Sequence, residues 1–192
     1  MAAVLIEPPA VEPVSLAEVK EHLRVDGPEE EPLIVALITT ARLTIEHLAG
    51  LALITQKWAV LRDSWPEAPA IELPVAPVAS IDALRVYDEA GSASLIAGDQ
   101  YFADLASRPA RLIRSNSSAW PAPGRVANGI EIELTAGFGA LPLEVPETLR
   151  WAVLMLVGHW FENRAAVGAD SQLRHMPLAV HAVLAPYRRV RL

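Results

Sequence analysis

The most extended apolar pattern in the chain lies near its C-terminus, between residues 145 and 167. From Leu149 onward apolar residues recur at i, i+3, i+4 and i+7, a spacing that places them on one face of a helix. Trp151 and other large apolar residues occupy the opposite side, so we expect this helix to be buried around most of its circumference. The pattern predicts a long core helix with these inward positions: Leu149, Val153, Leu156 and Trp160.

Two further helices are predicted near the N-terminus. Ser15 and Glu18 have the spacing of a capping box, which opens a short amphipathic helix ending near residue 25. A second helix runs from Pro32 to Gly50, a residue suited to terminating it. Its apolar stripe is broad enough for two partners. We expect one to be the long C-terminal helix and the other to be a different part of the chain or another subunit.

The period changes to two after Gly50, which indicates strands. Gly129 to Thr135 alternates cleanly, with Ile130, Ile132 and Leu134 on one face and glutamates on the other. We interpret residues 53–136 as a small antiparallel β module inserted between helical segments. Its other predicted strands lie after residue 54, over 81–87 with a hairpin turn at 88–91, and near 94–96, 101–104 and 111–114.

The chain closes with a predicted short helix over residues 177–185, which we expect Pro186 to end. A basic tail follows it. The predicted fold class is therefore α+β: a helical core of two N-terminal helices, one long C-terminal helix and a short last helix, with the inserted β module. We expect residues 1–192 to form a single domain that contains this module.

The amino-acid composition excludes several classes of function. The 192 residues include no cysteine, which excludes disulfides, thiol nucleophiles and zinc–thiolate sites. The formal charge of −7 is uneven, since residues 1–163 hold 22 acidic and 11 basic residues, whereas residues 164–192 hold one acid and five arginines. An acidic body repels nucleic acid. The start of the chain lacks the features of a signal peptide, so we expect a soluble, cytoplasmic protein without a membrane partner.

A search for chemistry finds no catalytic, metal-binding or cofactor-binding constellation. Gly137 and Gly139 follow a strand, but the third glycine of a nucleotide-binding fingerprint is missing. His159 and Glu162 share a helix face, yet two ligands do not make a metal site. The residues thus give no positive argument for an enzyme, a metal or a cofactor. Glu131 and Glu133 resemble the solvent face of a strand, although sequence alone leaves a glycosidase pair open.

Five segments of the chain, in this order, resemble phage head–tail connector proteins, and in particular the adaptor proteins of phage-like gene transfer agents. The segments are PVSLAEVKEHL (13–23), LITQKW (53–58), DLASRPARL (104–112), VPETLRWAVLMLVGHWFENR (145–164) and LAPYRRVRL (184–192).

The resemblance implies a virion structural protein that forms a ring of about twelve copies beneath the portal. Such a ring extends the DNA channel, through which DNA passes without sequence-specific binding, and docks the next connector or stopper on the tail side. It implies assembly in the cytoplasm and a final place at the head–tail junction of the virion or gene-transfer-agent particle. Two alternatives stay open: a small-molecule enzyme, which requires a deep polar pocket, and a DNA-binding regulatory module, which requires a basic recognition helix.

The basic tail is the candidate portal-binding segment. In an extended chain, alternate residues point to opposite sides, which puts Arg189 and Arg191 on one face and Val190 and Leu192 on the other. Such a segment suits an edge strand or a groove on an acidic partner. The competing interpretation is a solvated tail that only aids solubility. The hypothesis assigns the contact to these residues: Tyr187, Arg188, Arg189, Val190, Arg191 and Leu192.

Overall fold

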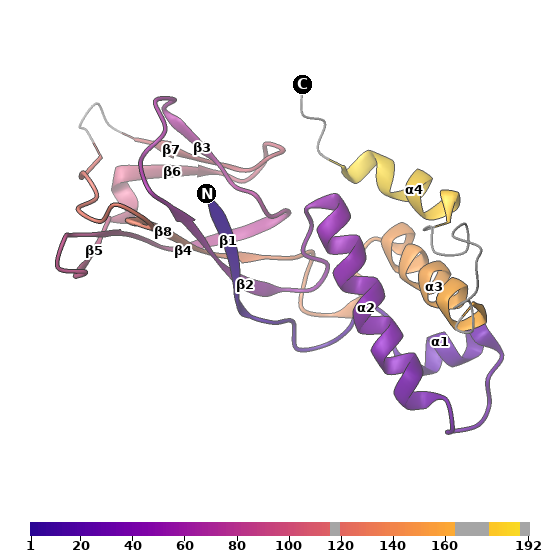
Figure 1. The fold of residues 1–192 in the computed structure, drawn as a ribbon. Helices are drawn as coiled ribbons and strands as arrows, with labels where there is room; N and C mark the ends of the chain where they lie inside the picture. The colour runs from indigo at the N-terminus through magenta and orange to yellow at the C-terminus, as the bar shows by residue number, and fades with distance from the viewer. Residues whose placement is uncertain (116–119, 164–176, 189–192) are drawn as a thin grey trace, which may run out of the picture. The chain divides into compact units, whose positions relative to one another are not determined.

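The computed structural model describes residues 1–115, 120–163 and 177–188 (Figure 1). The chain forms two compact units, and each combines separate stretches of sequence. Met1–Ala10 and Thr55–Phe138 form a β unit, while Val11–Ile54 and Gly139–Leu192 form a helical unit. The β unit thus takes in the first ten residues as well as most of the segment that the sequence analysis assigned to the β module.

The described residues of the β unit form two antiparallel sheets (Figure 1). Fully buried side chains come from both sheets, Ile71 and Leu112 from the small one and Leu84 and Ile132 from the large one. The large sheet has the strand order β1-β2-β8-β4-β5, with β1 Ala2–Glu7, β2 Gln56–Arg62, β4 Val78–Tyr87, β5 Ala93–Leu95 and β8 Ile130–Ala136. The small sheet has the order β3-β7-β6, with β3 Ala70–Glu72, β6 Tyr101–Asp104 and β7 Arg111–Arg114, and a 3-10 turn, η1, covers Gly98–Gln100.

Strand β8 lies at the centre of the large sheet and pairs with both β2 and β4. Its three inward residues, Ile130, Ile132 and Leu134, are fully buried, which confirms the alternation seen in the sequence. Each such side chain contributes on the order of 1.5–3 kcal/mol when fully removed from water. The alternation of β8 therefore sets which face of the large sheet contributes to the core.

Most predicted strands are present, but β1 and β3 were not predicted as strands. β1 lies at the sheet edge and is exposed at all six positions, so its sequence AAVLIE carries no alternation. β3 has only three residues and lies in a segment rich in proline, which usually argues against a strand. Both strands are defined by their pairing partners rather than by their own sequence.

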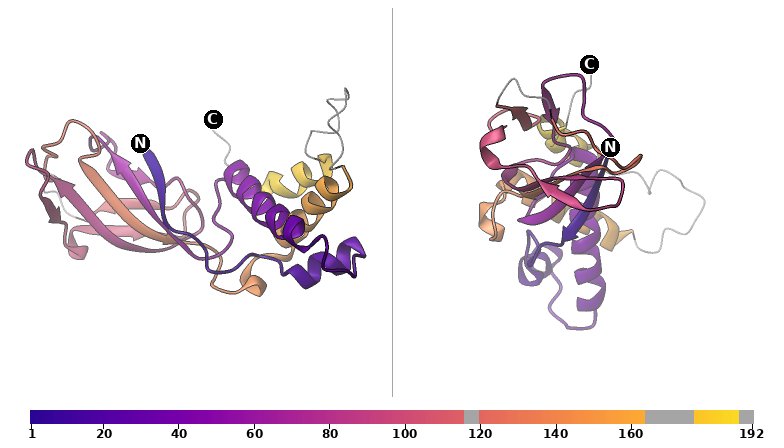
Figure 2. Two further views of the ribbon diagram at one scale, coloured as in Figure 1. Left: turned by 60° about the horizontal axis from the view of Figure 1, so that its bottom comes forward. Right: turned by 90° about the vertical axis from the view of Figure 1, so that its left-hand side faces the viewer.

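The described part of the helical unit contains four α-helices: α1 Leu16–Leu23, α2 Glu31–Ala49, α3 Glu147–Glu162 and α4 Leu178–Leu184 (Figure 2). Helix α3 contacts each of the other three, and α1 also contacts α2. The 3-10 turn η2 (Pro142–Glu144) precedes α3, and the 3-10 turn η4 (Ala185–Tyr187) follows α4. Together with the sheets, these helices confirm the predicted α+β class.

The ends of α1 and α2 follow the sequence prediction. The Ser15 hydroxyl accepts a hydrogen bond from the Glu18 amide at 3.2 Å, and the Ser15 amide donates to the Glu18 carboxylate at 2.7 Å. This capping box opens α1. Gly50 ends α2 with a φ of 67°, a left-handed conformation that glycine adopts without steric cost.

Helix α2 alone among the described helices has the length and composition of a membrane span. It nevertheless packs against α3 and holds the charged side chains of Arg42 and Glu46 in a buried position. The contacts show α2 as a core helix of its unit.

Burial of α3 is greatest on one face, and the prediction that Trp151 is buried is wrong. Leu149, Val153 and Leu156 are fully buried, whereas Trp160 is half-buried and Trp151 is 49% exposed. The neighbouring helices leave part of the Trp151 side chain accessible to solvent, although the His22 ring of α1 meets it edge-on. The predicted extension of α3 to residue 167 reaches past residue 163 and lies outside the described residues.

Pro186 does not end the last helix directly. Helix α4 ends at Leu184, and the turn η4 continues the helical path through Pro186 to Tyr187. Proline is tolerated there because the first residues of a helical turn need no N–H donor.

Candidate functional site

The predicted tail begins with two residues that contact the helical unit. The Tyr187 hydroxyl lies 3.1 Å from the Thr148 hydroxyl on α3. An Arg188 guanidinium nitrogen lies 3.2 Å from Nδ1 of His181 on α4. Tyr187 and Arg188 are half-buried, so they differ from the free tail that the sequence suggested. Arg189, Val190, Arg191 and Leu192 lie outside the described residues.

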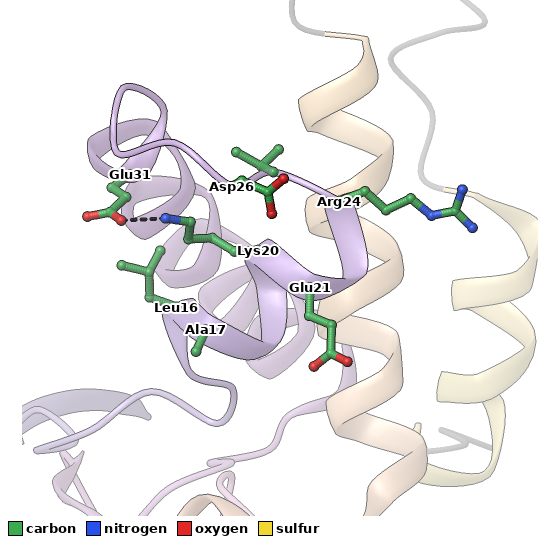
Figure 3. Close-up of a pocket in the computed structure, with 8 residues that line it drawn as sticks. Leu16, Ala17, Lys20, Glu21, Arg24, Asp26 and Glu31 are labelled. Atoms are coloured by element: carbon green, nitrogen blue, oxygen red, sulfur yellow. Dashed lines mark hydrogen bonds and ion pairs between the residues drawn. The ribbon is translucent and has the colours of Figure 1, made fainter.

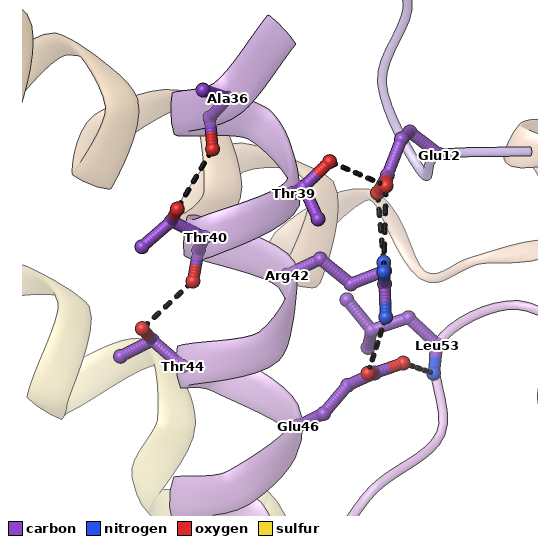
Figure 4. A network of polar contacts seen from close by, with 8 residues as sticks. All are labelled: Glu12, Ala36, Thr39, Thr40, Arg42, Thr44, Glu46 and Leu53. Atoms are coloured by element: carbon purple, nitrogen blue, oxygen red, sulfur yellow. Dashed lines mark hydrogen bonds and ion pairs between the residues drawn. The ribbon is translucent and has the colours of Figure 1, made fainter. Parts of the chain in front are cut away.

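A charged network lies inside the helical unit around Arg42 of α2 (Figure 4). Arg42 donates to the Glu12 carboxylate at 2.8 Å and to the Glu46 carboxylate at 2.9 Å. Glu46 also accepts from the Leu53 amide at 2.8 Å, and the Thr39 hydroxyl donates to Glu12 at 2.9 Å. The network therefore attaches two segments to α2: the segment before α1, through Glu12, and the segment after α2, through the Leu53 amide.

The electrostatics of this network favour a structural role. Burial alone lowers the pKa of Arg42, but the hydrogen bond to Glu12 and the charges of Glu46 and Glu12 outweigh it and raise the pKa. The guanidinium is thus held charged by two carboxylates. Its sequence signal was the pair of charges four residues apart inside an apolar helix, although nothing local identified Glu12 as the third member.

A hollow lies between α1 and α2 (Figure 3). Lys20 is directed at Glu31, and the two form an ion pair of 2.6 Å. Arg24 and Glu21 point away from this pair in the figure. The charged groups do not converge on a common point, which a small-molecule site requires.

The two glutamates of β8 are paired to one arginine. Arg85 of β4 lies 2.9 Å from the Glu131 carboxylate and 2.7 Å from that of Glu133. Tyr87 donates to Glu131 at 2.8 Å, and this bond, with burial, raises the pKa of Tyr87. Both carboxylates bind the Arg85 guanidinium on the sheet and do not flank an open cleft, so the arrangement does not match a glycosidase pair.

A second cluster joins β6 to β7. Asp104 accepts from the Ser107 hydroxyl at 2.6 Å and from the Arg111 guanidinium at 2.6 Å. These bonds lower the pKa of Asp104 from its ordinary value of 3.8 to about 2. Across the described residues no three His, Cys, Asp or Glu side chains gather as metal ligands. His159 instead has Asn163 as its neighbour, with the Asn163 amide donating to the His159 carbonyl at 2.7 Å.

Comparison with known proteins identifies the family. The family model described as head completion protein matches residues 12–190. This chain belongs to the head completion protein family. The match spans both units and confirms the resemblance to phage head–tail connector proteins that the sequence segments suggested.

Solved structures similar to this head completion protein come from gene transfer agent particles. A chain of the virion of a native gene transfer agent particle is 27% identical, with 100% of this chain and 97% of that chain covered and a TM-score of 0.84. A chain in the neck of an empty particle, computed with C6 symmetry, is 28% identical, with 100% and 97% covered and a TM-score of 0.81. A chain in the neck of a native particle, computed with C12 symmetry, is 30% identical, with 98% and 97% covered and a TM-score of 0.75. A search of curated protein sequences finds no match.

For a head completion protein the surfaces that matter are those that contact other proteins. The helical unit exposes several large apolar side chains, and the sequence analysis missed one of them by assigning Trp151 to the core. Its position opposite Leu149 and Val153 on a helix of 3.6 residues per turn was the available signal. Among the described residues of this unit the exposed large apolar side chains are Val11, Val35, Leu43, Leu141, Leu143, Trp151 and Leu178.

Proposed function

We propose that this head completion protein is a structural connector subunit at the head–tail junction of a phage or gene-transfer-agent particle. About twelve copies form a ring beneath the portal, extend the DNA channel and dock the tail-side connector. The observation that carries the proposal is the 30% identity, over 98% of this chain, to a chain in a particle neck with C12 symmetry. The subunit assembles in the cytoplasm and then stays in the particle.

The charged clusters support a structural role without catalysis. Arg42, Arg85 and Arg111 are each bound by one or two carboxylates of their own unit, at distances of 2.6–2.9 Å. Side chains that form these ion pairs hold elements together and are not available as an acid, base or nucleophile. The shifted pKa values of Asp104 and Tyr87 also arise inside such clusters.

The charge of the chain supports a channel through which DNA slides. Lysine and arginine contacts to phosphate are what hold DNA to a protein. This chain has 23 acidic and 16 basic residues, and several of the bases are already paired to carboxylates. A ring of such subunits carries more acidic than basic groups, so as a whole it repels phosphate.

The portal contact is assigned to the end of the chain. Arg189 and Arg191 supply charge, while Val190 and Leu192 supply apolar contact. The hydrogen bonds of Tyr187 and Arg188 support this proposal because they fasten the start of the segment to α3 and α4. The portal-binding part then comprises residues 189–192, and the two residues before it act as its anchor.

A truncation tests this assignment. Deleting residues 189–192 keeps Tyr187 and Arg188 with their hydrogen bonds, so we expect an unchanged melting temperature and loss of binding to the portal protein in a pull-down. The control is Arg108→Ala, which removes an exposed arginine from the β unit and should leave portal binding intact. Native affinity in the truncated protein would place the portal contact in the helices or the β unit.

A further inference from the structure

The large sheet of the β unit has an open edge strand on each side. Among the described residues, β1 pairs only with β2 and β5 pairs only with β4. The outer backbone N–H and C=O groups of an edge strand have no partner within the sheet, so they form a template for a further strand. The large sheet therefore offers two sites at which a strand of another molecule adds by main-chain hydrogen bonds.

The edge formed by β1 lacks the features that usually prevent such pairing. Natural proteins protect edge strands with charged residues, proline, bulges or a very short length. Residues 2–6 contain no charged residue and no proline, and the register shift of β1 lies at its end, between Leu5 and Glu7. β5 is protected only by its length of three residues, since its sequence Ala-Ser-Leu is also uncharged. Both edges present a large apolar side chain, because Val4 is 49% exposed and Leu95 is 69% exposed.

The two edges of the small sheet are better protected. Pro69 and Pro74 lie close to the two ends of β3. β6 carries Asp104, whose carboxylate lies 2.6 Å from the Arg111 guanidinium. Proline and charge both oppose strand addition. The open edges of the β unit are therefore those of β1 and β5.

Val4 and Leu95 lie on the same face of the large sheet. Directly opposed residues of neighbouring strands share a face. Val4 is opposite Ala59, which is opposite Glu133. Leu95 is opposite Arg85, which binds Glu133 at 2.7 Å. When the two edges of different copies meet in one sheet, these exposed apolar side chains come together on one face as cross-strand neighbours, a contact that stabilises sheets.

The strand directions identify a second copy as the occupant. All four pairings in the large sheet are antiparallel, so β1 and β5 run in the same direction. Two copies joined edge to edge in the same orientation therefore form a parallel pair with evenly spaced hydrogen bonds. A foreign strand at β1 leaves the edge of β5 open, whereas a second copy covers both edges with one kind of contact. A contact between two different surfaces of one subunit is also what repeats around a ring.

Charges at one end of this joint are complementary. The parallel arrangement places the start of β1 beside the start of β5. At the start of β1, Arg62 lies 3.3 Å from the sulfur of Met1, and no carboxylate of the described residues binds it. At the start of β5, Glu89 is exposed in the preceding turn and forms no ion pair within the described chain. The nearby Arg125 stacks instead on the Tyr87 ring, 4.3 Å from its centroid. Opposite charges thus meet across the joint.

The other end of the joint contributes no comparable attraction. Lys57 is already bound there to Glu7 at 2.9 Å, and the exposed Asp99 follows β5 in η1. The electrostatic part of the contact is therefore confined to the end that holds Arg62.

We propose that β5 of one copy pairs in parallel with β1 of the next, so that the large sheets continue from subunit to subunit around the ring. The inference rests on the proposed function, since it assigns a surface to the contact between ring subunits. Val4 and Leu95 are its apolar anchors, and Arg62 and Glu89 form an ion pair across it.

Cysteine cross-linking tests the joint, because the natural chain contains no cysteine. The double variant Ala2→Cys with Ala93→Cys places an exposed thiol at the start of each edge strand and keeps both anchors. The two thiols of one copy lie four strand spacings apart, about 19 Å, which a short bis-maleimide does not span. In the presence of portal protein we expect a ladder of covalent dimers, trimers and larger multimers on a denaturing gel.

Each single variant should stay monomeric. The matched control, Ala2→Cys with Ala106→Cys, moves the second thiol to an exposed position after β6 and should give no ladder. As a second readout, Val4→Lys and Leu95→Lys should each abolish multimers without lowering the melting temperature. Phe102→Lys, on the exposed part of β6, should preserve them.

A charge swap separates the joint from a structural effect. Arg62→Glu in the cross-linking variant should lower the yield of multimers several-fold, and adding Glu89→Arg should restore it, because the ion pair forms again with reversed polarity. Arg62→Glu with Glu72→Arg is the control, since Glu72 is exposed on β3, and it should not restore the yield.

Four results overturn the inference: no ladder from the double variant, an equal ladder from the matched control, dimers from Ala2→Cys alone, which indicate a symmetric pair of β1 strands, or no rescue by Glu89→Arg. Electron micrographs of the same samples separate this outcome from the proposed function. Rings on the portal without a ladder remove only the strand joint, whereas a ladder without portal attachment removes the connector role.

Discussion

Arg42 shows how single charged residues support this fold. It lies inside an apolar helix and is only 6% exposed. Its guanidinium binds two carboxylates from different parts of the helical unit. The sequence displays its partner Glu46 four positions away. It gives no indication of Glu12, 30 residues earlier, because that contact depends on how the preceding segment crosses α2.

Arg42→Met should destabilise the protein by about 3–5 kcal/mol, because it leaves Glu46 buried without its cation. Urea denaturation followed by circular dichroism measures the change. Arg108→Met, at an exposed position, is the matched control and should cost about 0.5 kcal/mol or less. A loss near the control value at Arg42 would contradict a structural role for the network.

The lowered pKa of Asp104 leads us to expect that the stability of the fold depends on pH. Its pKa is lowered to about 2 in the folded protein, so its bonds to Ser107 and Arg111 stabilise the fold above its ordinary pKa of 3.8. The contribution is lost as pH falls from about 4 to about 2. Asp104→Asn should therefore lower the melting temperature at neutral pH, with a difference from wild type that shrinks across this window. A difference that stays constant down to pH 2 would show that the charge of Asp104 is not responsible.

At the level of elements, local patterns were sufficient where the element is defined by its own residues. The capping box at Ser15, the terminator at Gly50 and the alternation of β8 all predicted what the structure contains. Prediction failed for elements whose conformation is set by pairing with another segment. The edge strand β1 exists through its pairing with β2, and its exposed residues have no periodicity to detect.

Helix α3 illustrates the same limit. Its apolar residues are distributed around the helix, but α1, α2 and α4 fully bury one face and leave Trp151, on the opposite side, partly exposed. Sequence cannot distinguish an apolar face covered by its own chain from one that remains available to another protein. Trp151 belongs to the second kind, and the residues of the proposed portal contact, 189–192, lie outside the described chain.

This difference predicts unequal costs along α3. Leu156→Ala removes a fully buried side chain and should cost about 2–5 kcal/mol. Trp160→Ala acts on a half-buried residue and should cost less than the roughly 3–5 kcal/mol of a fully buried tryptophan. Thermal unfolding of both variants checks the ranking. A larger loss at Trp160 than at Leu156 would mean that Trp160 is the more deeply packed residue.

At the scale of the whole molecule, net charge predicts weak binding to DNA. The chain carries a formal charge of −7, and six of the cations in its described part form ion pairs with carboxylates. We expect no submicromolar affinity for duplex DNA at physiological salt, measured by fluorescence anisotropy with a labelled duplex. A polylysine peptide is the positive control. Tight, salt-sensitive binding would contradict a channel that lets DNA slide.

The central claim is that this head completion protein is a ring subunit between head and tail. Electron cryomicroscopy of particles assembled with the chain tests it most directly. The account predicts density for the chain in the neck, next to the portal, as a ring of about twelve copies like the C12 neck to which the chain is similar. Particles whose neck lacks the chain, or that assemble complete head–tail junctions when it is deleted, would contradict the account.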